Sequence, residues 1–148
     1  SGKLYASGQA GERFAVRNSG SFAIVEGCGA HGCEYMTGGT AIILGAVGDN
    51  FGAGMTGGMA FIYDKKNEFE NFANPASIIW QSVETDYWKK FLEDSIKDFS
   101  SKTSSEKAKV ILGNFKEELK NFKQVCPIEM LDKLDNPISL RSHTKKAG

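Results

Sequence analysis

The sequence lacks any excess of charge and any long apolar run. Its 18 Lys and Arg residues equal its 18 Asp and Glu residues, so the formal net charge at pH 7 is zero. Without excess positive charge, the chain has no electrostatic footprint for nucleic acid or for an anionic membrane surface. Apolar runs such as Ala41 to Leu44 have the length of a strand and cannot span a bilayer. We therefore expect neither a nucleic-acid partner nor a membrane partner.

Cysteine and proline are also scarce, with three residues of each. The cysteines, Cys28, Cys33 and Cys126, are odd in number, and no apolar leader of the secretory type precedes the first motif. Small secreted domains instead carry a dense and even set of cysteines. We therefore expect reduced thiols and a cytoplasmic location.

Glycine and charge are distributed unevenly along the chain. Fifteen of the 17 glycines fall in residues 1–58, whereas residues 1–63 carry only seven of the 36 charged residues. Such a shift in composition predicts two architectures in one chain. We expect β-structure with an extended bridge over residues 1–82, helices over 83–134 and a flexible tail over 135–148.

The glycine-rich half contains a repeat. Gly20, Gly39 and Gly58 recur with a constant period of 19, and each begins a run of small, β-branched or aromatic residues: GSFAIVEG, GTAIILG and GMAFIYD. A weaker earlier copy is SGKLYASG. A period near 19, with strand-like runs between glycine corners, predicts a mainly β fold, a parallel β-helix, followed by a C-terminal α-helical segment.

Glycines and side chains have separate expected roles in such a coil. Glycine allows corners with positive φ or a close approach of two backbones. The expected corner glycines are Gly20, Gly29, Gly39, Gly48 and Gly58. Side chains one period apart should stack as ladders along the coil. The two expected ladders are Ala23–Ile42–Phe61 and Val25–Leu44–Tyr63. Which of them points inward stays open.

Two stretches match GxGxxG, the glycine spacing of a dinucleotide-binding loop. One is GCGAHG, which begins at Gly27, and the other contains Gly52, Gly54 and Gly57. A dinucleotide loop needs a helix after its glycines, because the helix N-terminus binds the pyrophosphate. A β-rich run follows Gly57 instead. We therefore interpret both stretches as corners of the coil.

The stretch CGAHGC brings Cys28, His31 and Cys33 within six residues. A structural zinc site needs four ligands, and no fourth is near. A nucleophilic Cys–His pair needs a third group to orient it, and the sequence shows none. Glu26 and Glu34 are an equally weak candidate for paired acids. We therefore expect no catalytic, cofactor-binding or metal-binding residue, and Cys33 should be buried as a small apolar side chain.

The charged half has apolar residues at helical spacing. Helices are predicted over residues 84–99, ETDYWKKFLEDSIKDF, and 103–122, TSSEKAKVILGNFKEELKNF. Thr103 and Glu106 fit a capping box at the start of the second helix. Pro127 follows FKQVC and should end that helix. Before both helices, SIIWQSV is predicted to be one more extended segment that continues the coil.

Three blocks of the sequence resemble a known family. GERFAVRNSG, VEGCGAHGCEYMTGG and NFGAGMTGGMAFIYD are similar to the C-terminal domain of the glutamate synthase large (α) subunit. The resemblance is dense over residues 2–64 and weaker to about residue 131. Cys28 stands where that family usually has an aliphatic residue. The resemblance implies a right-handed parallel β-helix, in agreement with the period of 19.

The resemblance also implies a role. The full enzyme forms glutamate from glutamine and 2-oxoglutarate with FMN and an iron–sulfur cluster, which its other domains bind. This chain would then be a non-catalytic support with no cofactor of its own. Its partners would be the remaining domains of that subunit, and the isolated chain could self-associate. The alternatives are a stand-alone β-helix subunit of another redox complex, such as formylmethanofuran dehydrogenase, and a small enzyme that uses Cys28, His31 or Cys33.

Overall fold

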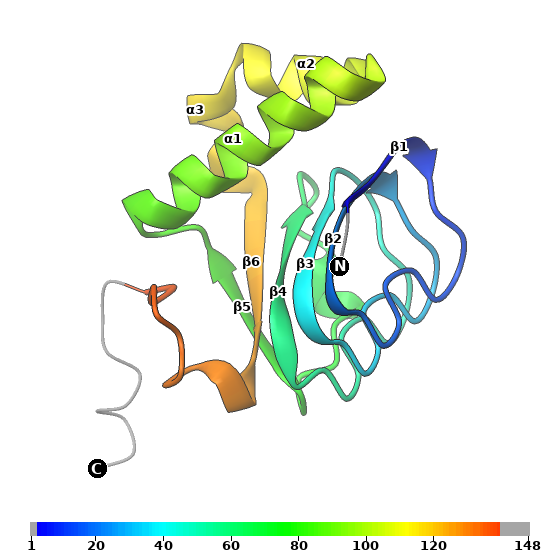
Figure 1. Ribbon diagram of the computed structural model, residues 1–148, viewed down its shortest axis with the longest axis vertical. Helices are drawn as coiled ribbons and strands as arrows, with labels where there is room; N and C mark the ends of the chain where they lie inside the picture. Colours follow the sequence, from blue (N-terminus) through cyan, green and yellow to red (C-terminus); the bar gives the residue numbers. More distant parts are fainter. Residues whose placement is uncertain (1–2, 140–148) are drawn as a thin grey trace.

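The computed structural model describes residues 3–139, which form a six-stranded sheet with helices packed against it (Figure 1). The strands are β1 (Lys3–Gln9), β2 (Ser19–Gly27), β3 (Thr37–Ile43), β4 (Gly57–Tyr63), β5 (Ile78–Ser82) and β6 (Phe122–Pro127). The α-helices are α1 (Asp86–Thr103), α2 (Glu106–Gly113) and α3 (Phe115–Glu118). Short 3-10 helices are η1 (Phe69–Asn71), η2 (Leu119–Asn121) and η3 (Ile128–Met130). Within the described range, no helix is long and apolar enough to cross a membrane.

Strands β1 to β4 are parallel neighbours and belong to successive turns of a β-solenoid. Leu4 of β1 pairs with Ala23 of β2, and Ala41 of β3 pairs with Ala60 of β4, so both pairs match the period of 19. Between the strands, each turn runs away from the sheet and returns to it (Figure 1). The predicted mainly β fold with a period near 19 is confirmed.

The side-chain ladders differ from the prediction by one residue between β2 and β3. Ser19 pairs with Gly38 and Phe22 with Thr40, so β2 holds one extra residue between these two pairs. A bulge of this kind shifts every later pair by one position. The ladders are therefore Ala23–Ala41–Ala60, Ile24–Ile42–Phe61 and Val25–Ile43–Ile62. The predicted pairing of Ile42 with Phe61 is confirmed, whereas those of Ala23 with Ile42 and of Val25 with Leu44 are wrong.

The two faces of the parallel sheet build two separate cores. One ladder points into the solenoid, where Val25, Ile43 and Ile62 pack with buried residues of the coil corners. The neighbouring ladder points the other way, and Phe61 packs there against α1. The face of α1 that meets it carries Leu92, Ile96 and Phe99, all fully buried. Burial of such a side chain contributes about 1.5–3 kcal/mol, so both sides of the sheet stabilise the fold.

The corner of the solenoid holds left-handed residues at every second position. The same three places recur in each turn: Arg13, Ala15 and Arg17, then His31, Cys33 and Tyr35, then Asn50, Gly52 and Gly54, with φ between +55° and +76°. A left-handed backbone costs a non-glycine residue roughly 1–2 kcal/mol. Backbone hydrogen bonds between turns hold this conformation, such as the bond from Cys33 N–H to Phe14 O at 2.7 Å.

The five glycines expected at corners differ in how strictly the backbone requires them. Gly39 and Gly58 both have a φ of +87°, and a Cβ on Gly48 would collide with the backbone of the preceding turn. A Cβ on Gly29 would lie only 3.1 Å from a side chain of the first turn. Gly20 lies within β2, and a Cβ there would meet nothing within 4 Å. The fold therefore does not require glycine at Gly20.

The first predicted helix is confirmed as α1. Its N-cap is Thr85, whose side chain accepts a hydrogen bond from the Trp88 N–H. The second predicted helix is shorter than expected, because α2 ends at Gly113. The predicted capping box is wrong: Thr103 ends α1, and Ser105 is the N-cap of α2, with its Oγ 3.1 Å from Ala108 N.

Strand β6 occupies residues that were predicted to end a helix. It pairs antiparallel with β4 and with β5, and therefore covers the edge of the parallel sheet. An uncovered edge leaves a row of backbone groups without partners. This long-range pairing outweighs the local helical pattern of the sequence. SIIWQSV contains an extended strand as predicted, β5, but among the described strands it pairs only with β6, and it does not continue the coil.

The beginning of the predicted flexible tail is packed against the domain. Ile138 is fully buried. Trp88 Nε1–H donates to Asn136 O at 3.0 Å, and Gln81 Nε2–H donates to Ile138 O at 2.7 Å. The predicted flexible tail, residues 135–148, thus begins with residues that contact the domain, and residues 140–148 lie outside the described residues.

Candidate functional site

The glycine motif around Gly52 is part of the solenoid wall. Gly52 and Gly54 fill two of the three left-handed places of the third turn, with φ of +76° and +67°. Gly57 begins β4, and a Cβ on it would lie far inside contact distance of the Thr37 carbonyl. A strand therefore follows the glycines, where a pyrophosphate loop would need a helix N-terminus. Backbone conformation or close packing therefore explains why glycine stands at each of these three positions, without a ligand.

The cluster of Cys28, His31 and Cys33 separates into two environments. Both thiols are buried in the solenoid core. His31 is partly exposed, and its Nδ1 lies 2.6 Å from Glu34 Oε2. No group of three or more His, Cys, Asp or Glu side chains that could hold a metal ion occurs among residues 3–139. The structure thus brings His31 together with Glu34, while the expected burial of Cys33 is confirmed.

Glu26 and Glu34, considered as paired acids, have different partners. Glu26 accepts a hydrogen bond from the Ser105 hydroxyl, which ties the end of β2 to the start of α2. Glu34 contacts His31 instead, through Oε2 and the imidazole Nδ1. Paired acid catalysis needs two carboxyl groups that face one substrate, and these two carboxyl groups are each engaged by a different part of the fold.

Burial suppresses the reactivity of the thiols. It raises the pKa of Cys28 to about 12 and that of Cys126 to about 12. The pKa of Cys33 is raised too, first by burial and then by the neighbouring Cys28. Because the thiolate is the nucleophile and the metal ligand, protonated buried thiols are inert at neutral pH.

We expect alkaline pH to destabilise the fold through these thiols. Above the ordinary thiol pKa of about 8.5, the unfolded chain loses a proton that the folded chain keeps. Stability should then fall by about 1.4 kcal/mol per pH unit for each thiol, up to the folded pKa. Urea unfolding at about pH 7.5 and about pH 10 measures this effect in the wild type and in Cys28→Ala. Between these two pH values, the wild type should lose about 2 kcal/mol more stability than Cys28→Ala, which lacks one of the thiols. An equal loss of stability in the two proteins would contradict the prediction.

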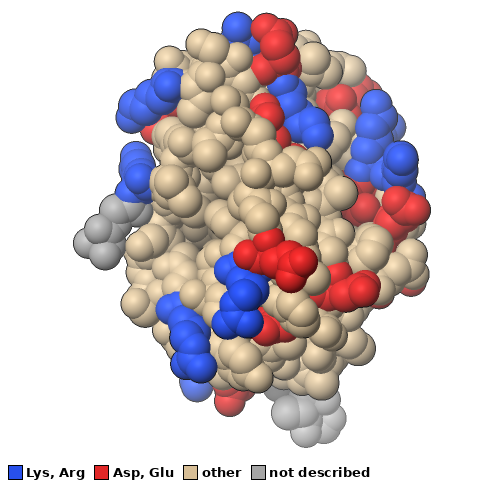
Figure 2. Space-filling view, turned by 90° about the vertical axis from the view of Figure 1, so that its right-hand side faces the viewer, with Lys and Arg blue, Asp and Glu red and all other residues tan. Residues whose placement is uncertain are grey.

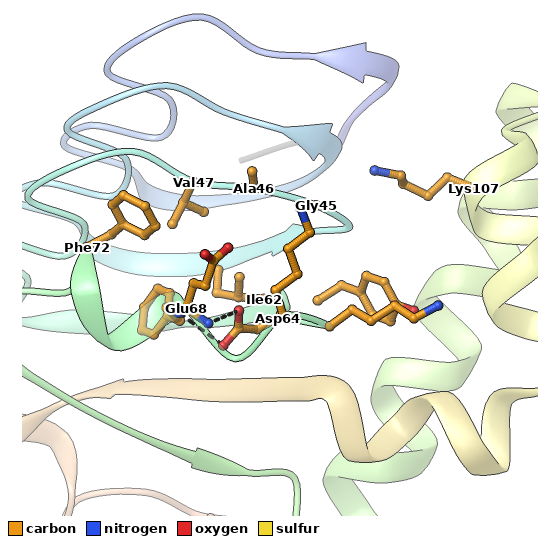
Figure 3. Close-up of a pocket in the computed structure, with 12 residues that line it drawn as sticks. Gly45, Ala46, Val47, Ile62, Asp64, Glu68, Phe72 and Lys107 are labelled. Atoms are coloured by element: carbon orange, nitrogen blue, oxygen red, sulfur yellow. Dashed lines mark hydrogen bonds between the residues drawn. The ribbon is translucent and has the colours of Figure 1, made fainter.

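A cavity of about 250 Å³ lies where strands β3 and β4 end (Figure 3). Its apolar wall is formed by Val47, Ile62, Phe69 and Phe72. Lys107 reaches toward it from α2, near Gly45 (Figure 3). The cavity therefore lies between the solenoid, the loop that follows β4 and the first turn of α2.

The electrostatic character of the cavity is basic. Asp64 is occupied by its own loop: its two carboxylate oxygens accept from Glu68 N–H at 2.8 Å and Phe69 N–H at 3.1 Å (Figure 3). Lys123 Nζ also lies 3.5 Å from Asp64 Oδ2. Three exposed lysines remain at the rim without an ion pair among the described residues, and these are Lys65, Lys66 and Lys107. The cavity suits a ligand with an apolar part and a carboxylate.

Sequence reasoning did not identify this cavity. A signal was present, because the glycine period stops after Gly58: the residue one period further on is Ser77. The run Asp64–Lys66 begins the interruption, where the third coil ends in charged residues. A break in a solenoid repeat often marks an insertion on one face, and such faces commonly bind partners.

Comparisons with known proteins agree with the fold. The model of the GXGXG motif family matches residues 1–128. The glutamate synthase (NADPH) large chain of Azospirillum brasilense is 52% identical over 139 residues, which cover 94% of this chain and 9% of that protein. The ferredoxin-dependent glutamate synthase of Antithamnion sp. is 48% identical over 126 residues, or 85% of this chain and 8% of that protein. The glutamate synthase (NADH) of Schizosaccharomyces pombe is 43% identical over 146 residues, or 99% of this chain and 7% of that protein.

The chain spans less than a tenth of the length of these curated relatives. Their similarity concerns the glycine-cornered solenoid and the helices that cover it, because each alignment extends over most of the chain. By its period, its corners and the match over residues 1–128, this chain belongs to the GXGXG motif family.

Proposed function

We propose that this chain is a structural, non-catalytic C-terminal domain of a glutamate synthase large chain. The observation that carries the proposal is the identity of 43–52% to three glutamate synthases, each matched over a small share of its length. The domain would support the parts of that protein that hydrolyse glutamine and reduce the product to glutamate. FMN and the iron–sulfur cluster would be bound by those other parts.

The interior of the domain supports a scaffold role. The solenoid is filled by its own side chains, and Val25, Ile43 and Ile62 close its core. Its thiols are buried and protonated, and the imidazole of His31 is engaged by Glu34. Three free, buried cysteines also suit a reducing compartment, and we propose a cytoplasmic location on that basis.

The open end of the solenoid supports a partner in the rest of the large chain. β1 is the edge strand, it pairs only with β2 among the described strands, and its Leu4 is 56% exposed. Figure 2 looks onto this end, and a broad uncharged area occupies the middle of the face. In the later turns, Cys33 N–H donates to the preceding turn, at Phe14 O. Ala15 is the equivalent residue of the first turn and has no preceding turn among the described residues.

We propose that other domains of the large chain cover this end. An uncovered edge strand is a template for pairing with another chain. When the chain is isolated, the same edge would pair with a second copy. Light scattering at high protein concentration should then show a dimer, and a clean monomer would contradict the self-association.

A triple variant of the full-length large chain tests the non-catalytic role. We expect Cys28→Ala, His31→Asn and Cys33→Ala together to leave kcat for glutamate formation unchanged at a temperature where the protein is folded. Asn is chosen at His31 because it tolerates the left-handed backbone there. Steady-state kinetics, with circular dichroism and bound-flavin content as controls, measure the effect. A loss of at least about a hundredfold, as for a missing acid–base group, with intact folding and flavin, would refute the proposal.

A further inference from the structure

Backbone donors at two places of each early turn are satisfied by the next turn of the solenoid. In the second turn, Cys28 N–H donates to Ala46 O at 3.0 Å, and His31 N–H donates to Asp49 O at 2.8 Å. The first turn makes the same two bonds, from Ala10 to Gly27 and from Arg13 to Ala30, each at 2.8 Å. Stacking thus supplies each of these N–H groups with a carbonyl one turn further along the axis.

The third turn lacks this cover at the same two places. Val47 and Asn50 stand one period after Cys28 and His31. The chain leaves the stack after β4, and it returns at Phe72, whose carbonyl accepts from Phe51 N–H at 2.9 Å. Neither the Val47 N–H nor the Asn50 N–H donates to a backbone carbonyl within residues 3–139. Two backbone donors, three positions apart in the sequence, are therefore left without an acceptor among the described residues at the edge of the third turn, and Asn50 is exposed.

Val47, which carries the first of these donors, lines the basic cavity. Asn50 follows it in the same turn. Around the cavity, Lys65, Lys66 and Lys107 have no ion pair within the described part of the chain, whereas Asp64 is already paired with Lys123. Glu68 is the one further carboxylate in the lining, so positive charge predominates at the rim.

We propose that the cavity binds an acidic, extended segment of the same large chain, from outside the 148 residues, as a partial fourth turn of the solenoid. Two carbonyls of that segment would accept from Val47 N–H and Asn50 N–H, as Ala46 and Asp49 do from the turn before. Its acidic side chains meet the three lysines, and an apolar side chain covers Phe69 and Phe72. Edge pairing gives such a segment affinity, and side-chain pockets give it specificity.

The proposal rests on the proposed function in one respect only, which is that the occupant belongs to the same polypeptide. That polypeptide is long enough, because more than nine tenths of each curated relative lies outside the matched region. A peptide backbone can supply two carbonyl acceptors at the spacing of these two donors, and an acidic peptide complements the charge of the three lysines.

Zero-length carbodiimide cross-linking of the full-length large chain tests the occupant directly. The reagent joins a lysine amine to a carboxylate that it contacts. We expect cross-links from Lys65, Lys66 or Lys107 to Asp or Glu residues of the same polypeptide outside the 148 residues. Cross-links to Asp64 or Glu68 alone, to a second copy or to a different protein would each overturn the proposal.

Hydrogen–deuterium exchange of the same protein provides the second readout. Peptides that contain Val47 and Asn50 should exchange roughly tenfold faster or more in the variant Lys65→Glu, Lys66→Glu, Lys107→Glu than in the wild type. The matched control is Lys90→Glu, Lys97→Glu, Lys116→Glu, which changes charge by the same amount on α1 and α3 without touching the cavity. Equal exchange in all three proteins would overturn the proposal. It would also be overturned if dialysis removed the protection of these peptides, because the occupant would then be a small, dissociable carboxylate. If the cross-linking or the exchange experiment fails while the triple variant of Cys28, His31 and Cys33 keeps its kcat, the proposal for the cavity is overturned and the proposed function still stands.

Discussion

Gly57→Ala is expected to lower the free energy of unfolding by about 3 kcal/mol or more. Its Cβ would fall inside the Thr37 backbone, which has no rotamer through which it could yield. Strands β3 and β4 would have to separate where Gly57 N–H donates to Met36 O at 3.2 Å. For a domain of this size, the melting temperature should fall by about 2–4 °C for each kcal/mol.

The matched control for this substitution is Gly20→Ala. A Cβ on Gly20 meets nothing within 4 Å, and its φ is not in the left-handed region. The change should therefore remain within about 0.5 kcal/mol, or stabilise slightly because alanine restricts the unfolded chain. Urea unfolding of both variants measures the contrast, and equal stabilities would show that close stacking of turns is not the reason for glycine at Gly57.

Phe61→Ala is expected to cost about 3–5 kcal/mol, as for other large-to-small changes in packed cores. The ring is fully buried between the sheet and α1, with its centroid 5.9 Å from those of both Trp88 and Phe91. Its removal would leave a cavity at the contact that holds α1 on β4. Unfolding followed by tryptophan fluorescence would report the loss of stability and the changed surroundings of Trp88 together.

Val110→Ala is the control for the loss of apolar volume alone. Val110 is 64% exposed on α2, so its truncation should change stability by less than about 0.5 kcal/mol. If Phe61→Ala cost no more than this, the helical layer would not be packed on the sheet as described.

The repeat was predictable from sequence because the glycines and the strand residues recur together. Gly39 and Gly58 are visible at the period of 19, and the backbone requires glycine at both. The register was not predictable, because the extra residue of β2 lies between Ser19 and Phe22 and leaves the glycine spacing unchanged. A local bulge alters pairing without any mark in the period.

Two other features depend on contacts that a local pattern does not contain. Residues 122–127 continue a helical pattern in sequence, but pairing with β4 and β5 makes them a strand. Arg13, Ala15 and Arg17 adopt left-handed backbones, although their side chains give no preference for that region. In each case, stacking or sheet pairing with distant residues overrides local propensity.

The cavity was missed for a related reason. The sequence shows where the period stops, after Gly58, but not that the chain returns to the stack at Phe72. Only that return defines a gap in the fourth turn, and only the fold places Lys107 of α2 beside it. The absence of a catalytic constellation among Cys28, His31 and Cys33 remains a prediction that the full-length kinetics will test.

The central claim is that the glycines of the GxGxxG stretches shape the backbone and hold no cofactor. Titration of FMN, NADH and NADPH against the protein, followed by flavin or nicotinamide fluorescence and by calorimetry, tests it most directly. We predict no saturable binding to this domain, and the same result for the wild type and for Gly54→Ala, a substitution within the motif. Saturable binding of any of the three that Gly54→Ala weakens, while the variant remains folded, would contradict the account.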